Sequence, residues 1–136
     1  MPEILNLENE KLAEGCETKG EYFRKVLTGK PYVLCMESAA EFMSLTDGNF
    51  CTYVDVYKLE DCVKENVGFE LLRGIYCTTV NQTINDILEN EGDPQILMEA
   101  LSTIYERSHY EELDIFPQNQ ERFDYYKQYG IEYYCE

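Results

Sequence analysis

The sequence predicts one domain of α+β (mixed α/β) class, with a small sheet of three to four strands covered by helices. Three observations support this class. The chain has 136 residues, enough for one domain, and 44% of them are hydrophobic, enough to fill a core. Apolar residues recur at helical spacing, most clearly in the C-terminal third. Between the helical segments lie short alternating or apolar runs that are typical of strands.

The N-terminal part of the chain is predicted to contain an arm and a helix. Residues 1–17 are mostly polar with scattered apolar anchors, so we expect an arm or a short helix there. Thr18 and Glu21 form a capping-box pattern. This pattern predicts a helix over about residues 18–29.

The middle of the chain has the features of a helix followed by strands. An apolar run at 32–35 precedes small and large apolar residues at helical spacing, which predict a helix over 37–45. Residues 50–57 alternate like a strand, and we expect the side with Val54 and Val56 to face the core. Residues 59–66 are predicted to be a polar connector. Two further strands are predicted at 67–72 and 75–78.

The C-terminal part is predicted to be helical. Thr79 and Gln82 form a second capping box, which starts a helix over about 80–89. Asp93 and Pro94 are typical of the start of the next helix, because Asp caps well and Pro fits the first turn. A linker at 108–116 and a last helix at about 117–134 follow.

The charge of the chain is strongly negative. Its 27 Asp and Glu against 11 Lys and Arg give a net charge of −16. Such a surface repels phosphate backbones, so we expect no direct binding to nucleic acid. Two interpretations remain: a general solubility charge, or an acidic face for a basic protein partner.

The sequence contains no signal for export or membrane insertion. No apolar run approaches the ~20 residues that a membrane span needs. Residues 1–6 lack the basic region and apolar stretch of a signal peptide. We therefore expect a cytoplasmic protein without membrane contact.

The cysteines are predicted to be free. The six cysteines are Cys16, Cys35, Cys51, Cys62, Cys77 and Cys135. A chain of this length without an export signal favours thiols in the core over a disulfide framework. No CxxC pair exists, which argues against a zinc site.

No convincing catalytic motif is present, and we expect no catalytic residue, cofactor or metal. His109 is the only histidine and lies in the polar linker, where a solvated side chain is the default. Among the many carboxylates, Asp55 is distinctive because it lies within a predicted strand. A strand carboxylate can bind Mg²⁺ or face solvent, and Asp55 is also a candidate partner contact.

The C-terminal segment 123–135 is dense in tyrosine. On a helix, Tyr126, Tyr129 and Tyr133 share a face. This face could dock the helix on the core, or it could bind a partner, since tyrosine is enriched at interfaces. Carboxylates beside tyrosines could also imitate phosphates beside bases.

Two segments, residues 32–46 and 74–88, with residues 52–57 between them, resemble the C-terminal domain of AbiEi-type antitoxins of bacterial abortive-infection systems. Residues 32–46 are similar to an apolar run, a Ser-Ala-containing helix and a Leu-Thr turn. Residues 52–57 occupy the strand position of the family. Residues 74–88 are similar to its strand followed by a Thr-containing helix start. The resemblance spans about residues 31–106.

The resemblance implies a fold and a function. Residues 18–136 would form one AbiEi-antitoxin-like domain, and the 30 or so residues before the resemblance are too few for the family's DNA-binding winged helix. It also implies a non-enzymatic antitoxin that neutralises a nucleotidyltransferase toxin in a toxin–antitoxin pair by direct contact. Two alternatives stay open: an acidic phage or mobile-element inhibitor that mimics nucleic acid (an anti-defence protein), and a small enzyme or metal-binding domain.

Overall fold

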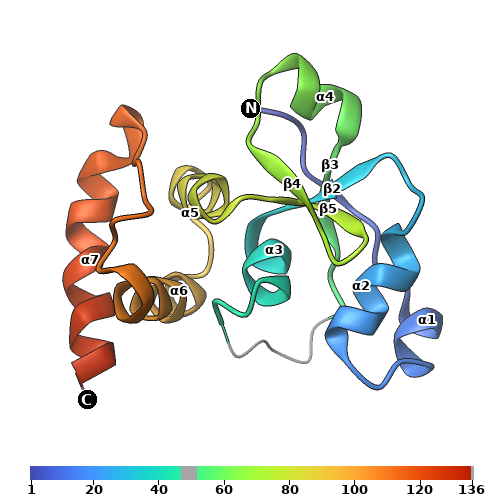
Figure 1. Ribbon diagram of the computed structural model, residues 1–136, viewed down its shortest axis with the longest axis horizontal. Helices are drawn as coiled ribbons and strands as arrows, with labels where there is room; N and C mark the ends of the chain where they lie inside the picture. Colours follow the sequence, from blue (N-terminus) through green and yellow to red (C-terminus); the bar gives the residue numbers. More distant parts are fainter. Residues whose placement is uncertain (47–51, 136) are drawn as a thin grey trace.

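The computed structural model describes the backbone of residues 1–46 and 52–135, and the side chains of these residues except 130 and 133–135. Within this part, the fold is mixed α/β, as predicted (Figure 1). The strands are β1 Leu5–Asn6, β2 Tyr32–Leu34, β3 Asp55–Lys58, β4 Phe69–Leu72 and β5 Ile75–Thr78. The helices are α1 Glu10–Glu14, α2 Lys19–Leu27, α3 Met36–Phe42, α4 Leu59–Lys64, α5 Val80–Glu89, α6 Pro94–Ser108 and α7 Gln120–Cys135, and a short 3₁₀ helix, η1 Pro117–Asn119, precedes α7.

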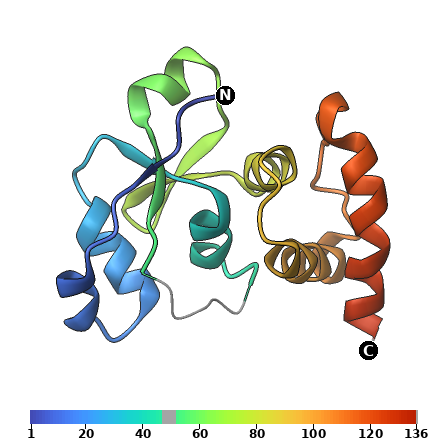
Figure 2. The same cartoon turned by 180° about the vertical axis from the view of Figure 1, so that it is seen from behind.

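The described strands form one sheet with the order β1-β3-β2-β5-β4. The central strands β2 and β5 are parallel, with Val33 opposite Tyr76, and the other pairs are antiparallel. Helices α1 and α2 lie on one side of the sheet, and α5, α6 and α7 lie on the other (Figures 1 and 2). Of the helical C-terminal third, α5 lies nearest the sheet, and α6 and α7 lie beyond it.

The sheet has one strand more than the largest number predicted, because the segment expected to be an arm contributes β1. Leu5 pairs with Val56 of β3, and Leu7 N donates to the carbonyl of Val54 (3.0 Å). Leu5 and Leu7 are partly buried against the core. A strand of two residues is too short to show alternation in the sequence, which is why it was not predicted.

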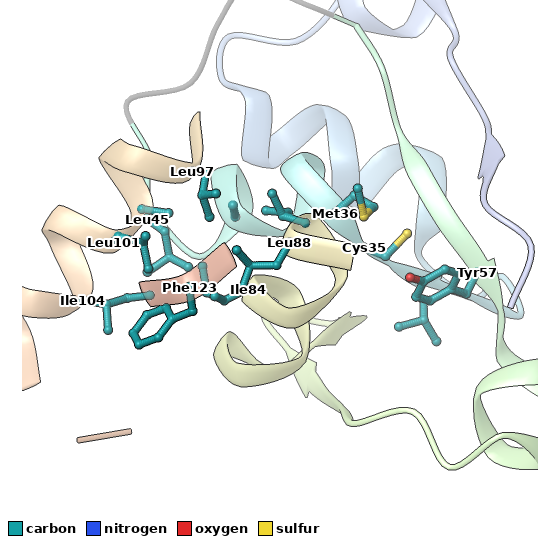
Figure 3. Close-up of a cluster of buried hydrophobic side chains, with 14 of the residues drawn as sticks. Cys35, Met36, Leu45, Tyr57, Ile84, Leu88, Leu97, Leu101, Ile104 and Phe123 are labelled. Atoms are coloured by element: carbon teal, nitrogen blue, oxygen red, sulfur yellow. The ribbon is translucent and has the colours of Figure 1, made fainter. Parts of the chain in front are cut away.

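Both faces of the sheet are buried. One cluster joins Leu34, Val56 and Cys77 to α2. The other joins Val33 and Tyr57 to α5, α6 and α7, and Figure 3 shows its side chains converging from these elements. A sheet that is covered on both faces has no solvent side, so the alternation of its strands cannot identify one.

The predicted strand at 50–57 is shorter in the structure, and one assignment within it was wrong. The strand β3 begins at Asp55, and residues 47–51 lie outside the described part of the chain. Val54 and Val56 are buried as predicted. Tyr57, which the alternation placed on the opposite side from the core, is also fully buried, because α5 covers that face.

The remaining elements agree closely with the predicted ones. The helix predicted at 37–45 is α3, and α4 occupies the predicted polar connector. The four cysteines whose side chains are described, Cys16, Cys35, Cys62 and Cys77, are free thiols. Within the described residues, no helix combines the length and apolar character needed to cross a bilayer.

The helix α5 begins at the predicted cap, although the capping box is not complete. Thr79 Oγ1 accepts a hydrogen bond from the backbone N–H of Gln82 (3.1 Å). The Gln82 side chain does not return to the cap; its Oε1 accepts from the N–H of Gly68 (3.0 Å) and its Nε2 donates to Asp86 (2.8 Å). Gln82 therefore ties the start of β4 to the middle of α5.

Thr79→Ala is expected to lower the free energy of unfolding by about 1 kcal/mol, because it removes an N-cap bond. Urea unfolding measures this loss. Thr28→Ala is the matched control, since the exposed Thr28 hydroxyl only donates to the Arg24 carbonyl within its own helix end. An unchanged midpoint for Thr79→Ala would contradict the capping role.

Candidate functional site

Helices α5, α6 and α7 and their connections, residues 80–135, form what we call the acidic helical layer (Figure 2). The helix α7 is held by Phe123, whose side chain is buried in the core cluster of Figure 3. The Tyr110 ring packs edge-on against Phe123 (5.4 Å between centroids), and its hydroxyl donates to the Lys127 carbonyl (3.0 Å). These contacts fix the position of α7, which forms the outer surface of the layer.

A buried asparagine anchors the connection between α6 and α7. Asn85 of α5 is 1% exposed, and its Nδ2 donates to the carbonyls of Asn81 (2.9 Å) and Asp114 (3.2 Å). Its Oδ1 accepts from the N–H of Phe116 (2.8 Å) and from Nδ2 of Asn119 (3.1 Å). One side chain therefore satisfies backbone groups that the connection could not pair by itself.

Negative charge is concentrated in the acidic helical layer. Residues 80–135 contain 12 Asp and Glu but three Lys and Arg, whereas residues 1–79 contain 14 and eight. The three cations of the layer pair with Glu91, Glu112 and Asp124. Within the described residues, the exposed acids of the layer without an ion pair are Glu89, Asp93, Glu106, Glu111, Asp114, Glu121 and Glu132.

The structure describes the side chains of two of the three tyrosines that were predicted to share one face of the last helix. Tyr126 is partly buried against the core, which fits the docking interpretation for this residue. Tyr129 is half-buried, with its ring 5.4 Å from that of Tyr125. The backbone at Tyr133 belongs to α7, and its side chain lies outside the described set.

Tyr125 is the exposed aromatic residue that the sequence reasoning missed. Its side chain is 57% exposed, and its ring also contacts that of Tyr126 (5.0 Å). On a helix, positions 121, 125, 129 and 132 follow one another at spacings of three and four. This spacing was readable from the sequence and places Tyr125 and Tyr129 between the carboxylates of Glu121 and Glu132.

Asp55 does not lie near the tyrosines of α7. It lies in β3, on the far side of the molecule from α7 (Figure 1). Its carboxylate accepts from Asn6 Nδ2 (3.1 Å), and burial raises its pKa from the ordinary value. Within the described residues, no group of three or more His, Cys, Asp or Glu side chains could hold a metal ion.

Asp86 is the most strongly perturbed carboxyl group that the structure describes. It is 3% exposed; its Oδ2 accepts from the Tyr57 hydroxyl (2.8 Å) and its Oδ1 from Gln82 Nε2 (2.8 Å). Burial raises the pKa of Asp86 to about 6, although the bonds from Gln82 and Tyr57 oppose the rise. With both oxygens occupied, this carboxyl group serves to bind α5 to β3.

His109 lies at the end of α6, exposed and in the left-handed region of the backbone (φ 53°). Its ring packs edge-on against Tyr105 (4.7 Å between centroids), one helical turn before it. The polar, solvated position predicted for the only histidine is thus confirmed.

Comparisons with protein families, curated proteins and solved structures find no match for this chain.

Proposed function

We propose that the protein is a non-enzymatic, antitoxin-like binding protein that neutralises a basic protein partner by direct contact through the acidic helical layer. The partner class that the sequence resemblance implies is a nucleotidyltransferase toxin. The single observation that carries the proposal is the uneven charge: 12 acids and three cations in residues 80–135. A rigid layer with this excess is suited to steering and orienting a positively charged surface.

The surface of α7 adds an anchor to this charge. Tyr125 is exposed between acidic positions of the same helix. Tyrosine offers large contact area and a hydroxyl at low entropic cost, and it is over-represented among residues that dominate binding energy. Charge on the layer would set the rate and orientation of encounter, and Tyr125 would contribute to the lifetime of the complex.

The same arrangement supports a second candidate function, an acidic inhibitor that occupies a nucleic-acid groove. Its specific observation is the alternation of Glu121, Tyr125, Tyr129 and Glu132 along one helix, in which rings lie between carboxylates as bases lie between phosphates. The two candidates differ in their targets: a nucleotidyltransferase for the first, and a nuclease or other nucleic-acid-binding effector for the second.

The test is affinity capture from nuclease-treated lysate of the source organism at low and moderate salt, using matched charge variants. The layer variant replaces Glu106, Glu111, Glu121 and Glu132 with Gln. The control variant makes the same change at four exposed acids outside the layer: Glu3, Glu14, Glu17 and Glu70. Both raise the net charge by the same amount, so only the position of the charge differs.

We expect a basic partner that the wild type and the control variant retain, and that the layer variant loses at least tenfold. A nucleotidyltransferase with this behaviour supports the antitoxin function, which rescue of cell growth on co-expression then tests. A nucleic-acid-binding effector that competes with DNA or RNA supports the inhibitor. Equal retention by both variants would contradict a role for the acidic helical layer.

A further inference from the structure

A small cavity lies on the other side of the sheet from the acidic helical layer, and most of the charged side chains that line it are positive. Its volume is ≈ 260 Å³, and it lies where the N-terminal turn of α2, the end of α3 and the tip of the β4–β5 hairpin meet. Figures 1 and 2 both show these three elements adjacent to one another. The volume is slightly below the range of about 300–1,000 Å³ that is usual for ligand pockets, which suits a small molecule.

The charged side chains that line the cavity are three cations and one acid. Lys19, Arg24 and Arg73 line it together with Glu41. Glu41 pairs with Lys19 (3.5 Å). Within the described residues, neither Arg24 nor Arg73 has a carboxylate partner. On a chain with net charge −16, these two guanidinium groups give the cavity a locally positive charge.

The uncharged lining residues are Thr18, Gly20, Ser44 and two buried phenylalanines. Phe23 and Phe42 contribute rings that pack edge-on (5.9 Å between centroids). The Arg73 guanidinium lies over the Phe42 ring (4.2 Å), and one of its donors bonds the Phe42 carbonyl. A guanidinium has five donors in a planar fork that matches an oxyanion, so this contact orients the group without using all of them.

The residue type at position 73 is not explained by the hairpin itself. Arg73 and Gly74 both have positive φ (48° and 90°), as in a type I′ turn, where Asn-Gly is the favoured pair. Arginine is therefore a poor local choice at this position. The glycine at position 20 is likewise not explained by its own helix, because other residues favour the first turn of α2 more. A Cβ at this position would meet no atom within 4 Å.

From this cavity we infer a binding site for a small oxyanion, either free phosphate or a small molecule that carries a phosphate or carboxylate group. Arg73 and Arg24 would hold the oxyanion, and the backbone at Gly20 leaves room beside it. The site is independent of the acidic helical layer, which lies across the sheet.

Titration of the ¹⁵N-labelled protein with phenyl phosphate, benzoate and inorganic phosphate tests the site by NMR. We expect saturable shifts of the backbone amides of Lys19, Gly20, Ser44 and Arg73. The stronger of phenyl phosphate and benzoate identifies the oxyanion class, and inorganic phosphate should also bind saturably, because the buried rings of Phe23 and Phe42 offer no surface to a ligand body.

Two variants remove the site by different means. Arg73→Asn restores the favoured turn pair and should weaken binding at least tenfold. Gly20→Glu places a carboxylate at the cavity and should abolish saturable binding, while an acid in the first turn of α2 favours the helix. Lys64→Asn, an exposed cation on α4 outside the cavity, is the charge-matched control for Arg73→Asn and should bind within twofold of wild type.

Thermal unfolding of each variant shows that the fold is retained, and Gly20→Glu keeps the test valid if Arg73→Asn is unstable. Wild-type affinity in folded Gly20→Glu protein would overturn the inference. So would shifts that spread over all exposed cations and rise without saturation.

Discussion

Asn85→Ala is expected to lower the free energy of unfolding by about 3–4 kcal/mol, a large part of the ~5–15 kcal/mol typical of a domain. Alanine removes both the donor and the acceptor of the buried amide. The N–H of Phe116 and the carbonyl of Asp114 then lose their partners, and each such group costs about 1–3 kcal/mol when it cannot reach water. The loss exceeds that of a surface hydrogen bond because the Asn85 amide is buried.

Urea unfolding measures the loss, and hydrogen exchange locates it. The amide of Phe116 should lose protection more than amides of the central strands, since the connection between α6 and α7 opens first. Asn6→Ala is the control: it deletes the same amide group from an exposed bond to Asp55 and should cost less than 1 kcal/mol. Equal losses for the two variants would refute the anchoring role of Asn85.

Asp86→Asn is expected to stabilise the protein at pH 8 by about 1–3 kcal/mol and to have little effect near pH 4. The pKa of Asp86 is about 6 when folded and near its ordinary value when unfolded. The folded state therefore binds the proton more tightly, and this group lowers stability fully above pH 6. The penalty is relieved as the pH falls from about 6 towards 4.

Asparagine preserves the contacts while removing the charge. Its Oδ1 can accept from Gln82, and its Nδ2 can donate to the Tyr57 hydroxyl. Urea unfolding of both proteins at pH 8 and pH 4.5 gives the difference in free energy at each pH. Glu89→Gln, which removes an exposed charge one turn away, controls for the relief of general repulsion. A difference for Asp86→Asn that does not change with pH would contradict the raised pKa.

The parts of the fold that could be predicted are those whose signals are local. The start of α5 at Thr79 and the start of α6 at Asp93 were predicted because a cap acts within three residues. The strand β1 was not predicted, because two residues show no period. Its place depends on pairing with Val56, about fifty positions away.

The polar residues inside α5 show a second limit of prediction from the sequence. The apolar residues Val80, Ile84, Ile87 and Leu88 share one face of this helix. Asn85 and Asp86 lie off that face, where exposed side chains are usual. They are buried because β3 and the connection between α6 and α7 cover them. These partners lie about 30 residues away in the sequence, so the spacing of residues within the helix cannot indicate them.

The tyrosine pattern of α7 was informative about the helix and less so about its surfaces. Periodicity grouped Tyr126 with Tyr129, but the direction in which a helix packs depends on its neighbours. The core receives Phe123 and part of Tyr126, which leaves Tyr125 outward. Had the docking face been known, the exposed position of Tyr125 would have followed from the same helical spacing.

The buried cluster of Figure 3 draws side chains from Val33 of the sheet and from Phe123 of the last helix. Neither half of the chain can close this cluster alone. A nascent chain that lacks α7 would expose the apolar surfaces of α5 and α6, so stable folding must await the synthesis of α7. For the same reason the acidic helical layer cannot be transplanted as a separate module, and any fusion that aims to transfer its binding should carry all of residues 1–136.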